Sequence, residues 1–275
     1  MSVKLIATDF DGTILIEGEF KNQKDIETIK KLQNQDFKFI GITGQPYYAA
    51  VTYCQQMHMD KFFDLIVAEN GAYISKISKQ EPIRSLVIDN EVILQLEKTV
   101  SQNKENVCFC ISSDEKVLYI GSNVVEAEIL KHPWFKNWQT KHIQESATRN
   151  IHQLTIICNK EIKDEIDEIL NEHRDIVNWT FDESNGKLFY TVNHIDASKG
   201  KALKFLSEYF NIPLSDIMVF GDGSNDISMF QIAGTSVAMG NSIAELKAIA
   251  THTTDTVQNN GVSLFLEKYF IHKED

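Results

Sequence analysis

The sequence lacks the patterns that mark membrane, secreted and nucleic-acid-binding proteins. Its 275 residues contain 27 Lys and Arg against 39 Asp and Glu, a net charge of −12. Nucleic acids and anionic membranes are bound through basic surfaces, so this balance argues against both. No window approaches the roughly 18 apolar residues of a membrane span, and the N-terminal segment lacks the basic start and cleavage site of a secretory signal. We therefore expect a cytoplasmic protein.

Cysteine is also scarce. The chain has four cysteines, all in apolar surroundings and none in a CxxC pair: Cys54, Cys108, Cys110 and Cys158. This spacing favours reduced core thiols over disulfides or a zinc site.

Alternating apolar and amphipathic segments predict an α/β fold. Over residues 1–83, the apolar runs KLIATDF, FKFIGIT and DLIVAEN are separated by helical patterns. The same alternation returns over residues 190–275. Strands connected through helices form right-handed crossovers in a parallel sheet. We expect the two segments to build one Rossmann-like, doubly wound core.

The middle of the chain, residues 84–189, has a different pattern. Apolar strands such as VCFCIS, HQLTIIC and KLFYTVN mix with two helical segments, and two of the strands are separated only by a short turn. Short connections between strands are typical of antiparallel sheets. We therefore expect an α+β cap domain inserted into the core.

Polar residues collect where predicted core strands end or helices begin. They are Asp9, Asp11, Thr43, Gly44, Lys199, Asp222, Asn225 and Asp226. In open parallel sheets, ligands bind beyond the carboxyl ends of the strands. Singly, these residues are ordinary caps, turns and surface charges, but three acids at one edge repel one another unless a cation neutralises them. Mg²⁺, with oxygen ligands and a substrate phosphate, suits this combination.

The motifs DFDGT, GITG, SKGKAL and GDGSND, in this order, resemble the four motifs of the haloacid dehalogenase superfamily. An insert between the second and third motifs, together with AENGAYI and VAMGNS, is similar to the Cof-type phosphatases of that superfamily. The resemblance implies a phosphatase for small phosphorylated metabolites, phosphate monoesters such as sugar phosphates. It also implies a cap that closes over the site and contacts the substrate. We expect a monomer or a weak homodimer, because no pattern in the sequence marks an exposed apolar face.

The same resemblance assigns roles to individual residues. Asp9 attacks phosphorus and becomes an aspartyl phosphate, while Asp11 protonates the leaving oxygen and then activates water. Thr43, Gly44 and Lys199 bind the phosphoryl group, and Asn225 either orients Lys199 or touches phosphate. Asp9, the Asp11 carbonyl and Asp222 hold Mg²⁺, with Asp226 acting through water or from behind the ligands.

One residue departs from the pattern of the superfamily. Gln45 stands where related proteins often carry Arg, and an amide cannot pair bidentately with an anion as Arg does. We therefore expect a preference for smaller or less anionic substrates.

A catalytically weak sensor of phosphorylated metabolites is the main alternative to a phosphatase. A receiver-like signalling domain and a phosphomutase are two others, disfavoured respectively by chain length and by the place of the insert.

Overall fold

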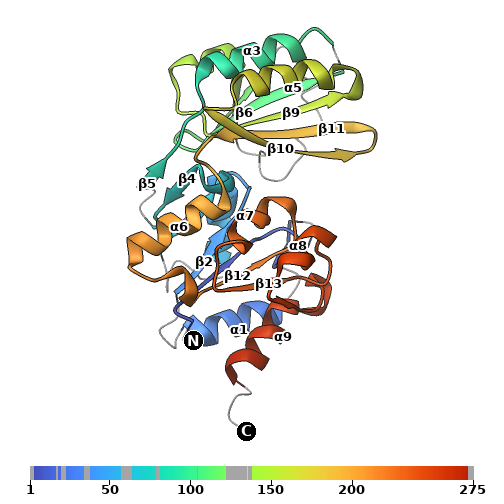
Figure 1. Cartoon of the computed structure of the whole chain (residues 1–275). Coiled ribbons are helices and arrows are strands. Elements are labelled where there is room, and N and C mark those ends of the chain that lie inside the picture. Colours follow the sequence, from blue (N-terminus) through green and yellow to red (C-terminus); the bar gives the residue numbers. More distant parts are fainter. Residues whose placement is uncertain are drawn as a thin grey trace. The chain divides into compact units, whose positions relative to one another are not determined.

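The computed structural model describes residues 3–16, 18–19, 23–33, 38–56, 64–78, 81–103, 105–121, 135 and 138–271. These form two compact units (Figure 1). The first contains Met1–Gln45, Ala50–Ile83 and Ser198–Asp275, and the second contains Pro46–Ala49 and Arg84–Ala197.

The first unit is built on a sheet in the order β14-β13-β12-β1-β2-β3-β4-β5. The six strands from β14 to β3 are parallel, whereas β4 runs antiparallel to β3. The bounds are β1 (Leu5–Thr8), β2 (Lys38–Ile42), β3 (Ile66–Ala68), β4 (Tyr73–Ser75), β5 (Pro82–Ser85), β12 (Ile217–Gly221), β13 (Thr235–Ala238) and β14 (His252–Thr253). The parallel α/β core predicted from the sequence is confirmed.

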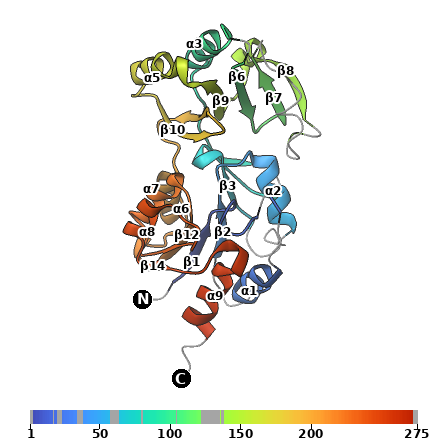
Figure 2. The same ribbon diagram turned by 90° about the vertical axis from the view of Figure 1, so that its right-hand side faces the viewer.

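Helices cover both faces of this sheet (Figure 2). On one side lie α6 (Lys199–Phe210), α7 (Ile227–Phe230) and α8 (Ala244–Ile249). On the other lie α1 (Gln23–Gln33), α2 (Tyr47–Gln56) and α9 (Gly261–Leu266). Because neighbouring side chains of a strand point to opposite faces, strands covered on both sides read as continuous apolar runs.

The chain winds outward from β1 in one direction through β2 and β3, then returns to lay β12 and β13 on the other side. The strand order therefore reverses between β1 and β12. Doubly wound sheets open a crevice at this point, beyond the carboxyl ends of the two strands. Asp9 follows β1 and Asp222 follows β12, so the fold itself places both residues there.

The second unit carries a six-stranded sheet in the order β10-β11-β9-β6-β7-β8, antiparallel except between β7 and β8. Two helices, α3 (Asn90–Val100) and α5 (Lys163–Glu172), pack on one face over a core formed with β6, β9 and β11. The strands are β6 (Val107–Ser112), β7 (Val117–Ile120), β8 (Gln139–His142), β9 (Gln153–Asn159), β10 (Val177–Ser184) and β11 (Lys187–His194). This is the α+β architecture expected of a cap.

All four cysteines are buried free thiols. Among the described residues, no helix combines the length and apolar character needed to cross a membrane.

His152 is a fully buried histidine in the second unit. The backbone N–H of Ser113 donates to its Nδ1 at 3.4 Å, and its Nε2 lies 2.8 Å from the Ser85 hydroxyl. These contacts suit the neutral ring. Burial lowers the pKa of His152 from 6.5 to about 4, although the Asp114 carboxylate opposes the shift.

We predict that the second unit loses stability as the pH falls below 6.5. Between pH 6.5 and 5 the unfolded chain takes up a proton at His152, whereas the folded chain stays largely unprotonated there. The unfolding free energy therefore falls by about 1.6 kcal/mol over this range. Urea denaturation followed by tryptophan fluorescence measures this, because every tryptophan of the chain falls within 84–189. His152→Gln should flatten this pH dependence; an equally steep dependence in the variant would contradict the assignment.

Candidate active site

A buried ion-pair cluster lies at the switch point of the core sheet. Lys199, the first residue of α6, is completely buried. Its Nζ donates to Asp9 Oδ1 at 2.5 Å and to Asp226 Oδ1 at 2.6 Å. An ammonium group without water needs such partners, because burial of an uncompensated charge is very costly. Lys199 therefore ties the segment after β1 to the segment after β12.

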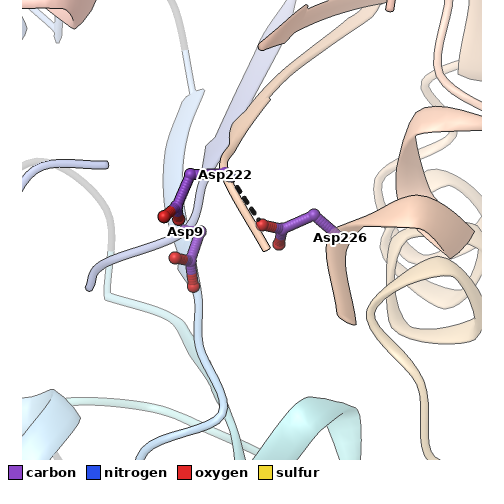
Figure 3. A group of neighbouring side chains, drawn as sticks. All are labelled: Asp9, Asp222 and Asp226. Atoms are coloured by element: carbon purple, nitrogen blue, oxygen red, sulfur yellow. Dashed lines mark hydrogen bonds between the residues drawn. The ribbon is translucent and has the colours of Figure 1, made fainter. Parts of the chain in front are cut away.

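Asp226 connects this pair to the loop that carries Asp222. Its Oδ2 accepts the backbone N–H groups of Asp222 and Gly223, each at 2.9 Å. Figure 3 shows the three carboxylates gathered beside the strand ends, with the Asp226–Asp222 contact dashed. One oxygen from each of the three lies within 4.8 Å of the others, a spacing that could hold a metal ion. Both Asp226 oxygens thus accept hydrogen bonds within the cluster.

The cluster has too little positive charge for its acids. Burial raises the pKa of Asp9; Lys199 opposes this, and the Asp226 and Asp222 carboxylates reinforce it. Burial, followed by the Asp226 carboxylate, raises the pKa of Asp222 to about 6. For Lys199, burial lowers the pKa, but the carboxylates of Asp226 and Asp9 outweigh it, so the net pKa is raised. One ammonium among three carboxylates leaves an excess of negative charge that a divalent cation would neutralise.

Gly12 allows the loop after β1 to pass against Asp222. Its φ is +75°, and a Cβ at this position would lie 2.1 Å from Asp222 Oδ2. Both the left-handed backbone and the close approach require glycine here. Phe10, between the two acids of the motif, is fully buried, while Asp11 is exposed.

The loop after β2 reaches Asp11. Gln45 Nε2 donates a hydrogen bond to Asp11 Oδ2. The Thr43 hydroxyl oxygen accepts the backbone N–H of Gln45 at 3.1 Å. With that oxygen engaged as an acceptor, the hydroxyl proton of Thr43 can be donated elsewhere, for instance to a phosphoryl oxygen.

A strained turn follows β3. Glu69, Asn70 and Gly71 have φ values of 51°, 56° and 98°. Consecutive left-handed residues that are not glycine cost free energy and are concentrated at functional sites. The turn is fixed from the neighbouring loop, since Glu69 N–H donates to Gln45 O and Asn70 N–H donates to Thr43 O, both at 3.0 Å.

Asn225 takes a different partner from one of those expected. Its Nδ2 donates to Asn70 Oδ1 at 3.0 Å, whereas Lys199 is oriented by Asp9 and Asp226. A Cβ on Gly44 would lie 2.9 Å from Asn70 Oδ1 and 3.4 Å from Asn225 Nδ2. Gly44, Asn70 and Asn225 therefore form a second group of neighbours.

Three residues of this region carry roles that sequence reasoning missed. Asn241 Nδ2 donates to Gly12 O at 2.8 Å and to Asp222 Oδ2 at 3.3 Å. Thr13 Oγ1 donates to Asp222 Oδ1 at 3.3 Å, and Asn70 is described above. Asn241 and Asn70 stand in VAMGNS and AENGAYI, whose similarity to the related proteins was the available signal.

Comparison with known proteins assigns the family. The profile of haloacid dehalogenase-like hydrolases matches residues 6–266. The chain belongs to this family, which confirms the resemblance drawn from the four motifs and the expected enzyme class, a haloacid dehalogenase-type phosphoric monoester hydrolase.

Relatives match over nearly the full length of the chain. A putative phosphatase from Haemophilus influenzae is 29% identical, covering 98% of this chain and 99% of its own. The 5-amino-6-(5-phospho-D-ribitylamino)uracil phosphatase YitU from Bacillus subtilis is also 29% identical, with 97% of each chain covered. A haloacid dehalogenase-like hydrolase from Bacteroides thetaiotaomicron, 22% identical, has the same fold, with a TM-score of 0.83 over 98% of this chain and 100% of its own.

We predict that Gly12→Ala abolishes the site while Gly186→Ala does not. Both glycines have φ +75°, but a Cβ at Gly186 meets nothing within 4 Å. Each substitution should cost about 1 kcal/mol of stability through backbone strain. Only Gly12→Ala displaces the Asp222 carboxylate, so hydrolysis of p-nitrophenyl phosphate should fall about 100-fold or more in that variant alone. Equal activities of the two variants would show that the contact with Asp222 has no catalytic importance.

Proposed function

We propose that the protein is a Mg²⁺-dependent phosphatase that hydrolyses small phosphate monoesters, such as sugar phosphates, through an aspartyl-phosphate intermediate. The observation that carries this proposal is the buried Lys199 ammonium shared by Asp9 and Asp226. The hydrogen bond from Lys199 holds Asp9 Oδ1 at the end of β1. Asp9 Oδ2 is then the oxygen that would attack phosphorus.

The donor set fits Mg²⁺. Hard carboxylate oxygens are its preferred protein ligands, and it commonly uses one or two of them together with substrate phosphate. Asp9, Asp222 and the Asp11 backbone carbonyl would hold the ion, with Asp226 supporting them from behind. When bound, Mg²⁺ supplies positive charge that stabilises the phosphoryl oxygens.

Two carboxylates divide the chemistry. In the first step an Asp9 oxygen forms a bond to phosphorus as the bond to the leaving oxygen breaks, and Asp11 gives that oxygen a proton. In the second step Asp11 takes a proton from water, which attacks phosphorus and releases Asp9. Lys199 and the Thr43 hydroxyl stabilise charge on the phosphoryl oxygens throughout.

The proposed substrate class is supported by the charge of the site and by the relatives of the chain. The acidic site repels anions, so a single phosphoryl group bound with the metal and Lys199 suits it better than a polyanion. Among the relatives, YitU is named for a phosphate ester of a sugar alcohol attached to a pyrimidine. A screen of phosphorylated metabolites should therefore begin with sugar and sugar-alcohol monophosphates.

We predict that substitutions of Asp9 and Asp11 differ in whether a covalent intermediate accumulates. Asp9→Asn should reduce turnover to background and form no covalent species. Asp11→Asn should slow turnover by about 100-fold or more, because general acid and base assistance is lost. With a good leaving group, the phosphorylated enzyme should then accumulate in this variant. Mass spectrometry of acid-quenched reactions detects it; full turnover by Asp9→Asn would refute the nucleophile assignment.

We also predict that chelation of divalent cations stops turnover and that Mg²⁺ restores it. Asp222→Asn removes a ligand charge and should raise the Mg²⁺ concentration for half-maximal rate about tenfold or more. Titration of activity against Mg²⁺ measures both effects. If the wild-type protein bound phosphorylated metabolites in Mg²⁺ but hydrolysed none of the panel, the sensor alternative would replace the phosphatase.

A further inference from the structure

Gln45 lies in a rigid position beside the proposed acid. The side chain is buried, and the backbone is fixed on both sides. Its N–H donates to Thr43 Oγ1 at 3.1 Å, and its carbonyl accepts the N–H of Glu69 at 3.0 Å. The loop therefore presents the amide to Asp11 Oδ2 with little freedom to turn away.

The two polar atoms of the Gln45 side-chain amide differ in their hydrogen bonding. Gln45 Oε1 is buried and accepts no hydrogen bond from the part of the chain that the structure describes. A buried acceptor left in this state is unfavourable, so satisfying the amide itself does not explain its orientation. Asp11, by contrast, is exposed, and water can solvate its carboxylate. The hydrogen bond therefore restricts how the Asp11 carboxylate can turn.

We propose that Gln45 is a positioning residue that fixes which oxygen of Asp11 transfers the proton. This inference rests on the proposed role of Asp11 as the acid. Since the amide N–H donates to Oδ2, that oxygen remains an acceptor and the transferable proton is carried by Oδ1. As the bond from phosphorus to the leaving oxygen breaks and the bond to Asp9 forms, the Oδ1 proton moves to the leaving oxygen. Asp11 is left as a carboxylate to which Gln45 still donates.

The test compares leaving groups of one shape. Phenyl phosphate and p-nitrophenyl phosphate share a ring, but nitrophenolate departs readily without a proton. In Gln45→Leu and in Gln45→Met, which is closer to Gln in length and also lacks a donor, kcat/KM for phenyl phosphate should fall about tenfold. The value for p-nitrophenyl phosphate should fall less than about twofold. An equal fall for both esters, or no fall for either, would overturn the proposal.

A double-mutant cycle supplies the control. In the Asp11→Asn background, which has no proton to give, Gln45→Leu should cause no further loss with phenyl phosphate. An additive loss would overturn the proposal, because Gln45 would then act independently of Asp11. The thermal midpoint of Gln45→Leu should equal or exceed that of the wild type, since a buried unsatisfied acceptor is removed. Failure of the proposed function is distinguishable, because the wild-type protein would then hydrolyse neither ester.

Discussion

The buried ammonium of Lys199 is the constraint on which the site depends. It enters from the first turn of α6, where Ser198 caps the helix by accepting the N–H of Lys201. From there it bonds carboxylates that follow β1 and β12. Removing the ammonium would leave two carboxylates desolvated and unpaired, and removing either carboxylate would leave the ammonium undercompensated. The same group of charges thus connects the ends of β1 and β12 and forms the proposed active site.

Much of the core and of this group could be predicted from the sequence. Apolar runs such as LIAT and IMVFG mark doubly covered strands, and Asp9 and Asp222 directly follow them, so the parallel sheet brings both to one edge. Strand β4 was harder to predict, because three residues carry too little periodicity to define a strand that runs antiparallel to β3. The predicted boundaries of the cap, 84 and 189, remain predictions.

Contacts between loops could not be derived in the same way. The Gln45–Asp11 hydrogen bond depends on where two loops pass each other, and Gln45 in the sequence indicated only the loss of a guanidinium. Likewise, Asn is a residue type that tolerates left-handed backbone, but nothing in the sequence indicates that Glu69 adopts it next to Asn70. Asn225 bonds Asn70 because this turn brings the two amides together. Such details are set by tertiary packing, which overrides local preference.

The pairing of β1 with β12 also determines at which stage of protein synthesis the site can form. Thr13 and Asp222, which bond each other beside the site, are separated by 209 positions along the chain. Contacts of such long range form late, after the loop between them has closed. The strands of the second unit are near one another in sequence, and all strands of its sheet are present once residue 194 has been synthesised. During synthesis the second unit can therefore fold before the charge cluster of the first is assembled, and chains that end just before β12 contain Asp9 and Lys199 but lack Asp222 and Asp226.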